Sequence, residues 1–239
     1  MPNNIINRLC LDGNKNDIKR LIERVKGKDS PLDFNKIVPM PKALDIESGS
    51  RTNKGLAAYR DFISVYTALD DNKDLLNIPK EKEDAFLRTR KDIKRDEWKL
   101  GKAAFQNQLR YGTPTWYEWR IANWGTKWSA YNVKVIDDKT IEFQTAWSHA
   151  MPVIQELAKQ FPHVQFDYSW ADEDLGMNVG KAEFEYGELV SYEFFTGQSK
   201  CAYELAAELW GLDLAEEGFV FDEEKQIYEY CSDESPQMS

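Results

Sequence analysis

The N-terminal segment has the hydrophobic pattern of a strand followed by a helix. Residues 4–13 mix apolar and polar positions in an extended pattern, and Ile18, Leu21, Ile22 and Val25 then repeat at helical spacing. Gly27 follows as a helix stop. Residues 32–41 contain two prolines two positions apart, which predicts an edge strand or a docked loop.

From residue 47 to residue 110 the pattern becomes helical and strongly charged. A polar break over 47–53 precedes an apolar stripe made of Tyr59, Phe62, Ile63, Tyr66 and Leu69. Pro79 begins a second predicted helix over 80–95, and a third runs from Trp98 to Leu109. We interpret residues 47–110 as a helical insertion.

The next stretch concentrates aromatic residues: four of the eight tryptophans fall between Trp116 and Trp128. Thr115 and Glu118 have the spacing of a capping box, and Gly125 offers a left-handed stop. A helix is therefore predicted over 116–123.

Three hairpins, one further strand and two helices are predicted after this stretch. The first hairpin has β-branched alternation around an acidic turn, and the helix that follows it has a proline in its first turn and another after its end. The predicted strands are 132–136, 140–145, 164–170, 181–186 and 189–195, and the predicted helices are 152–161 and 199–210, with a last short hairpin over 219–230.

Without the insertion, the order of elements is close to the split β-α-β pattern of ferredoxin type. We therefore predict an α+β fold with an antiparallel sheet and helices on one face. The predicted divisions are a ferredoxin-like domain over 1–46 and 111–197, the helical insertion over 47–110, and an acidic C-terminal helix and tail over 198–239.

Specific strings in these segments resemble the YubB ferredoxin-like family of phage and plasmid proteins. The strings are Asn123-Trp124-Gly125-Thr126-Lys127-Trp128-Ser129-Ala130-Tyr131, Phe143-Gln144-Thr145-Ala146-Trp147-Ser148, Tyr186-Gly187-Glu188 and Val38-Pro39-Met40-Pro41. The resemblance covers about residues 1–42 and 111–195, and it departs where a tryptophan is expected near residues 4–5. It implies a ferredoxin-like domain in a mobile-element protein. The family carries no established catalytic residues.

Composition indicates a folded protein with an uneven charge. The chain has 239 residues and a net charge of −10, and residues 165–239 alone carry 3 basic and 19 acidic residues. No apolar run approaches the ~20 residues of a membrane span, and no secretory signal is present, so we expect a cytoplasmic protein. Three scattered cysteines and two histidines predict no metal site, no disulfide framework and no cofactor.

Two surfaces are candidates for binding. The first is the aromatic stretch, where large side chains either wedge a helix onto the sheet or form an exposed platform; its candidate contacts are Trp116, Trp119, Trp124, Lys127 and Trp128. The second is a basic cluster in the insertion, which is either a solvated helix face or a phosphate-contacting one; its residues are Arg88, Arg90, Lys91, Lys94 and Arg95.

These features favour a binding role over catalysis. The first hypothesis is an accessory binding protein of a phage, prophage or plasmid that inhibits a host system through an acidic or Trp-rich surface. The acidic C-terminal third either imitates nucleic acid or only keeps the protein soluble. A nucleic-acid-binding protein using the basic cluster and the aromatic stretch is the alternative. An enzyme remains a third hypothesis, with Asp172, Glu173 and Asp174 as magnesium ligands or as a solvated turn, but the sequence identifies no catalytic residues.

Overall fold

The computed structural model describes residues 3–69, 74–195, 197 and 199–231 and divides the chain into two compact units. Unit 1 comprises Met1–Pro39 and Asn123–Ser239, and unit 2 comprises Met40–Ala122. The sequence placed the corresponding breaks after residues 46 and 110. The chain returns from unit 2 to unit 1 within helix α5 (Trp116–Trp124).

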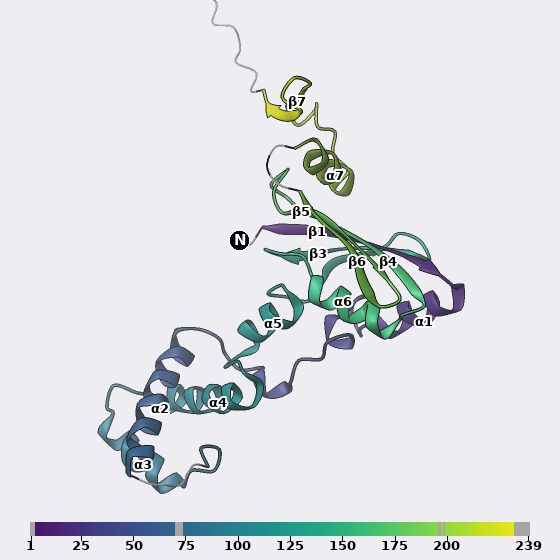
Figure 1. Ribbon diagram of the computed structural model, residues 1–239. Coiled ribbons are helices and arrows are strands. Elements are labelled where there is room, and N and C mark those ends of the chain that lie inside the picture. The colour runs from purple at the N-terminus through teal and green to yellow at the C-terminus, as the bar shows by residue number, and fades with distance from the viewer. Residues whose placement is uncertain (1–2, 70–73, 196, 198, 232–239) are drawn as a thin grey trace, which may run out of the picture. The chain divides into compact units, whose positions relative to one another are not determined.

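Unit 1 is built on a six-stranded antiparallel sheet (Figure 1). Its strands lie in the order β2-β3-β1-β4-β5-β6. Helix α1 (Lys15–Val25) follows β1, and helix α6 (Met151–Gln160) connects β3 to β4, so the first four strands have the split β-α-β arrangement. The predicted α+β, ferredoxin-like fold is confirmed. The strands are β1 (Asn4–Gly13), β2 (Tyr131–Val135), β3 (Thr140–Ala146), β4 (Val164–Asp172), β5 (Val179–Glu185) and β6 (Glu188–Phe195).

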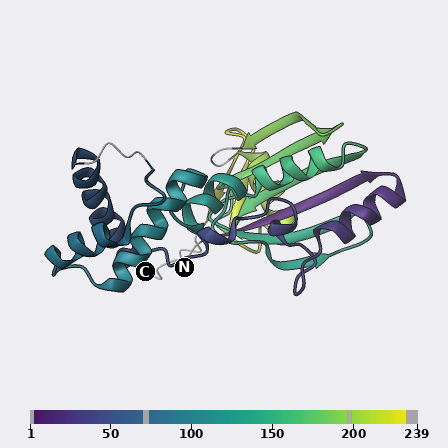
Figure 2. The same cartoon turned by 90° about the horizontal axis from the view of Figure 1, so that it is seen from below.

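Helices α1 and α6 cover one face of this sheet, as Figure 2 shows. Alternate residues of β1 point to this face, because side chains of a strand alternate between its two sides. Ile5 and Leu9 of β1 and Ile154 and Leu157 of α6 are completely buried. The 3₁₀ turn η1 (Phe34–Lys36) adds the buried ring of Phe34.

Helix α7 (Lys200–Trp210) packs on the opposite face of the sheet. Ile6 and Ala171, which point away from α6, form a buried cluster with Ala202 and Ala206 of α7. Strands β7 (Phe219–Asp222) and β8 (Ile227–Tyr230) form a separate hairpin beside α7, where Tyr203 and Tyr228 stack. The C-terminal helix and hairpin were predicted as additions to the fold, and residues 232–239 of the predicted tail lie outside the described residues.

Unit 2 is helical and has its own core. It contains the 3₁₀ turn η2 (Lys42–Leu44), α2 (Ser50–Leu69), α3 (Lys80–Thr89), α4 (Arg95–Tyr111) and the first turns of α5. The predicted stripe of α2 is buried at Tyr59, Phe62, Ile63 and Tyr66 and packs with Trp98 of α4; the side chain of Leu69 lies outside the described part.

The helix predicted over 80–95 is wrong at its C-terminal end, because α3 stops at Thr89. The guanidinium of Arg90 folds onto the carboxylate of Asp92, with Nε–Oδ1 and Nη2–Oδ2 distances of 3.0 and 3.1 Å. The Glu97 carboxylate then accepts a hydrogen bond from the backbone N–H of Lys94, which starts α4 at Arg95. Local side-chain bonds at the turn therefore override helical propensity over residues 90–94.

No helix in the described part of the chain is both long enough and apolar enough to cross a membrane.

Candidate functional site

The five predicted contact residues of the aromatic stretch do not form one surface. Trp124 is completely buried; its indole N–H donates to the carbonyl of Val38 at 2.9 Å, and its ring meets Phe34 edge-on. Trp119 is 8% exposed and thus also buried. Both indoles are therefore inaccessible to a ligand. Their burial agrees with the interpretation in which large aromatic side chains pack a helix into a core.

Trp116 is half-buried in unit 2, where the guanidinium carbon of Arg120 lies 4.9 Å from the centroid of its ring. Lys127 and Trp128 lie in unit 1. No shared site of Trp116 with Lys127 and Trp128 is defined, because these residues belong to different units.

Lys127 and Trp128 instead meet Trp147, which follows the end of β3. The ammonium of Lys127 lies 4.8 Å from the ring centroid of Trp128 and 4.8 Å from that of Trp147. The two indoles are 39% and 46% exposed. We call Lys127, Trp128 and Trp147 the Trp–Lys–Trp cluster; it is an exposed cation–π arrangement built from two segments.

Two local features bring these segments together. Gly125 adopts a left-handed conformation (φ 77°), which ends α5 as the sequence predicted. The buried hydroxyl of Thr126 then donates to the carbonyl of Ala146 and accepts from its N–H, at 2.8 and 3.1 Å. This reciprocal pair fixes the loop that carries Lys127 and Trp128 against the end of β3, next to Trp147.

Trp147 has a strained backbone. Its φ of 69° lies in the left-handed region, which a bulky residue rarely adopts. The conformation is held by a hydrogen bond from the Trp147 N–H to the carbonyl of Asn3, at 2.9 Å. Strain of this kind costs on the order of 1–3 kcal/mol and concentrates at functional sites. Because Trp147 is exposed, packing of its ring in the core does not account for this strain.

An acidic loop lies beside the cluster at the same end of the sheet. We define it as Asp172, Glu173 and Asp174. The side-chain amide of Asn3 donates to both Asp172 and Asp174, at 3.2 and 2.9 Å, and Asn3 also holds Trp147 through its carbonyl. Burial, reinforced by the charges of Asp174 and Glu173, raises the pKa of Asp172 above its ordinary value.

A second chain of contacts connects Trp128 to the same loop. The ring of Tyr131 lies edge-on to Trp128 at 6.4 Å, and its hydroxyl donates to the Asn4 amide oxygen at 2.7 Å. The Asn4 amide nitrogen donates to Glu173 at 2.6 Å. Burial and the negative charge of Glu173 raise the pKa of Tyr131. The Trp–Lys–Trp cluster and the acidic loop are thus connected through Asn3, Asn4 and Tyr131, and we call the two together the sheet-end site.

The three carboxylates of the acidic loop are engaged in local hydrogen bonds. Among the described residues, no group of three His, Cys, Asp or Glu side chains is placed to hold a metal ion. The Asp172 carboxylate is used by the amide of Asn3 and by the backbone N–H of Asp174, at 3.2 and 3.0 Å. This geometry matches the solvated-turn interpretation of the three acidic residues. The prediction that the chain uses no cofactor remains a prediction.

The predicted basic cluster lies in unit 2, and its five cations are not equivalent. Arg90 binds Asp61 as well as Asp92, with an Nη1–Oδ2 distance of 2.8 Å to Asp61. These hydrogen bonds raise the pKa of Arg90. Arg88, Lys91, Lys94 and Arg95 are exposed, and three of them line an open depression of about 340 Å³ together with Asp84 and Leu87.

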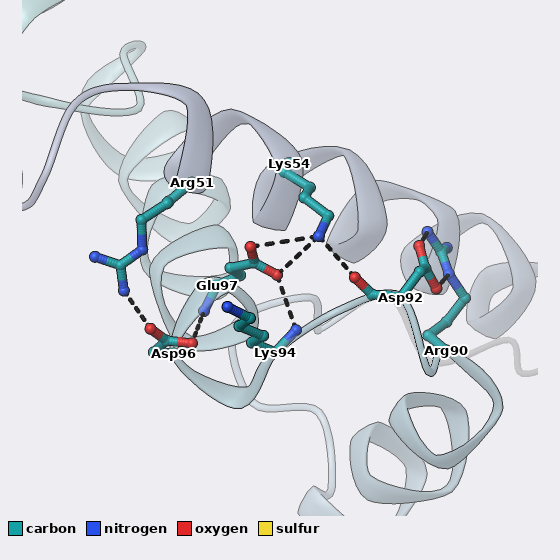
Figure 3. A network of polar contacts seen from close by, with 7 residues as sticks. All are labelled: Arg51, Lys54, Arg90, Asp92, Lys94, Asp96 and Glu97. Carbon is teal, nitrogen blue, oxygen red and sulfur yellow. Dashed lines mark hydrogen bonds and ion pairs between the residues drawn. The ribbon is translucent and has the colours of Figure 1, made fainter.

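Part of this cluster belongs to a structural network that joins α2 to the start of α4 (Figure 3). Lys54 donates to the carbonyl of Asp92 at 2.6 Å and to the Glu97 carboxylate at 3.1 Å, while Arg51 pairs with Asp96. The hydrogen bond from the backbone N–H of Lys94, and after it the ammonium of Lys54, lower the pKa of Glu97. Many of the charged side chains in this region therefore stabilise the junction between α2 and α4.

The acidic C-terminal part is only partly neutralised. Lys225 pairs with Asp222 and Glu229, and Arg8 pairs with Glu208. Within residues 199–231, which the structure describes, five carboxylates form no ion pair: Asp213, Glu216, Glu217, Glu223 and Glu224. These side chains leave the predicted acidic surface open to a positively charged partner.

Sequence reasoning missed Trp147 and the asparagines that connect it to the acidic loop. Trp147 is present in one of the strings that carry the family resemblance, and an isolated tryptophan between a predicted strand and a predicted helix was a signal that could have been used. Its proximity to Lys127 could not be inferred, because it depends on the buried hydrogen bonds of Thr126 with Ala146.

The topology and the site define the class of protein as one with a ferredoxin-like α+β domain. Residues 123–229 match a family model described as the ferredoxin-like domain in Api92-like protein. The matched segment includes Lys127, Trp128, Trp147 and the acidic loop.

Among solved structures, the crystal structure of protein Api92 from Yersinia pseudotuberculosis aligns with a TM-score of 0.42 and 14% identity, over 82% of this chain and 99% of that chain. No curated protein matches the chain. The family match identifies a ferredoxin-like domain in residues 123–229.

Proposed function

We propose that this chain is an accessory binding protein of a phage, prophage or plasmid that binds a basic host or mobile-element protein through the sheet-end site. The observation that carries the proposal is the exposure of Trp128 and Trp147 around Lys127, at the end of the sheet that also carries the acidic loop. Exposed indoles in a preorganised cluster are typical anchors of protein interfaces. The function is binding without catalysis.

Charge supports a basic partner. Unit 1 carries 15 basic and 28 acidic residues, a net charge of −13, whereas unit 2 carries 16 and 13, a net charge of +3. A field of one sign accelerates association with a partner of opposite sign and weakens with salt. The unpaired carboxylates after α7 extend this negative surface, so inhibition of a nucleic-acid-binding host protein is the form of the proposal that agrees with the charge.

The test is capture from nuclease-treated host lysate on the immobilised chain, with identification by mass spectrometry. Three chains are compared: the wild type, the double variant Trp128→Ala/Trp147→Ala, and the control Tyr186→Ala, whose ring is 82% exposed elsewhere in unit 1. We expect one protein bound by the wild type and the control, lost from the double variant, and released between about 0.1 M and about 0.5 M salt. Capture that is unchanged in the double variant contradicts the proposal.

Nucleic-acid binding is the second candidate, and the exposed cations around the depression in unit 2 favour it. Arg88, Lys91 and Arg95 are arranged around this depression and have no ion pair within the described residues. Contacts to phosphates would make binding steeply salt-dependent. If single-stranded nucleic acid binds at low salt and Arg88→Ala/Lys91→Ala/Arg95→Ala abolishes this binding, the second candidate replaces the first.

A further inference from the structure

The space between Trp128 and Trp147 has the dimensions of a cation clamp. One ammonium group lies 4.8 Å from both ring centroids, so the two centroids are no more than about 9.6 Å apart, which is twice that distance. Two indoles within this separation can both contact one flat or compact cation. In the structure that cation is the ammonium of Lys127, which belongs to the same chain.

Lys127 is held weakly in this position. Within the described residues it forms no ion pair, and its contacts are to the two half-exposed rings. A cation–π contact at an exposed site shifts an equilibrium only a few-fold, because water competes for the ammonium. A side chain with a better fit can therefore displace it at little cost.

The surroundings of the clamp favour a second positive charge. Glu173 and Asp174 are exposed, and within the described residues their side chains are bonded to the neutral amides of Asn4 and Asn3, without a basic partner. Asn3 holds the backbone of Trp147, and Asn4 reaches Trp128 through Tyr131, so each carboxylate is connected through one asparagine to a segment that carries an indole. Their charges remain available to a cation that enters it.

We propose that Trp128 and Trp147 clamp an arginine side chain of a basic partner segment, and that Lys127 is an internal placeholder that leaves when the arginine enters. This inference rests on the proposed function and names the chemistry of the partner. A guanidinium is planar and weakly hydrated, so it stacks on indoles better than an ammonium does. Its N–H groups also bond to carboxylates in pairs, which Glu173 or Asp174 provides.

The placeholder role makes an unusual prediction: removing a surface lysine tightens binding. The probe is an acetylated hexa-arginine peptide, and its affinity for the full chain is measured by calorimetry. The test variant is Lys127→Gln, and the control is Lys134→Gln, which removes the same charge from an exposed site on β2. We expect Lys127→Gln to bind roughly two- to fivefold more tightly than Lys134→Gln, because the internal competitor is absent.

A third chain, Lys127→Gln/Trp147→Ala, must lose this gain, since the gain requires both rings. Near-ultraviolet circular dichroism establishes that each variant is folded. Equal affinities of Lys127→Gln and Lys134→Gln overturn the placeholder role. Weaker binding by Lys127→Gln, or hexa-glutamate binding that requires Lys127, overturns it as well and makes Lys127 a direct contact for an anion.

The lysate and peptide experiments distinguish failure of the arginine clamp from failure of the proposed accessory binding function. If the lysate partner depends on Trp128 and Trp147 while the peptide shows no gain with Lys127→Gln, only the arginine clamp is overturned. If the peptide gain is present and no lysate protein is captured, the clamp stands and the proposed accessory binding function falls.

Discussion

Trp147 has a large, exposed ring and a backbone conformation that is unfavourable for a residue with a side chain. Its φ of 69° is unfavourable for any residue with a Cβ, and its ring is 46% exposed. Glycine adopts this region without a steric cost. The residue is therefore explained by binding better than by stability.

Substitution of Trp147 separates these two roles. We expect Trp147→Gly to be more stable than Trp147→Ala by about 1 kcal/mol, because glycine relieves the left-handed strain. Urea unfolding of both variants measures the difference, and partner capture is lost in both. If Trp147→Ala equals or exceeds Trp147→Gly in stability, the strain assigned to this position is absent.

His149 has a different role, inside the fold. Its ring stacks on Trp170 at 4.0 Å, and burial lowers its pKa to about 4 despite a hydrogen bond with Asn178. The unfolded chain has a histidine pKa of 6.5, so it takes up a proton before the folded chain does. Stability from this residue is present above pH ~6.5 and is lost as the pH falls toward 4.

The size of this effect follows from the shift of the pKa. A change from 6.5 to about 4 corresponds to about 3 kcal/mol of unfolding free energy. We expect His149→Phe, which keeps a ring on Trp170, to remove this part of the pH dependence in urea unfolding between pH ~6.5 and ~4. An unchanged pH profile would exclude His149 as its source.

At the scale of elements, helices α2 and α4 approach through two glycines. A Cβ on Gly101 would lie 2.0 Å from the carbonyl carbon of Gly55, and one on Gly55 would lie 1.8 Å from the Glu97 oxygen. The backbones themselves are in contact, so neither position accepts a side chain unless the helices separate. The Lys54–Glu97 pair lies at the same junction.

Gly101→Ala is therefore expected to destabilise unit 2 strongly, by about 2–4 kcal/mol, because it forces two packed helices apart. Gly49→Ala is the matched control, since nothing lies within 4 Å of its added Cβ. Thermal unfolding followed by circular dichroism compares the two. A loss no larger than that of the control would show that α2 and α4 are not in backbone contact.

The elements also show what a single sequence can predict. Periodicity and proline placement predicted β1, α1, α6 and the two hairpins, because these signals are local. The break between α3 and α4 was missed, because it depends on Arg90 folding onto Asp92. In the candidate site, Lys127 and Trp128 were predicted and Trp147 was not, since only the folded chain brings Thr126 to Ala146.

At the scale of the whole molecule, charge is divided between the units. Unit 1 has a net charge of −13 and contains the sheet-end site, whereas unit 2 is slightly basic. In the proposed interface, the exposed rings of Trp128 and Trp147 would be the apolar part and the carboxylates the electrostatic part. Both parts belong to the unit that contains the ferredoxin-like domain.

The most direct test of this account is an NMR titration of the ¹⁵N-labelled chain with the protein captured from lysate, observing the indole N–H signals. Single Trp→Phe variants assign these signals. We expect the signals of Trp128 and Trp147 to shift, while that of Trp124, whose N–H is bonded to Val38, stays in place. Shifts confined to Trp116, or signals of Trp128 and Trp147 that do not move at saturation, would contradict the sheet-end site.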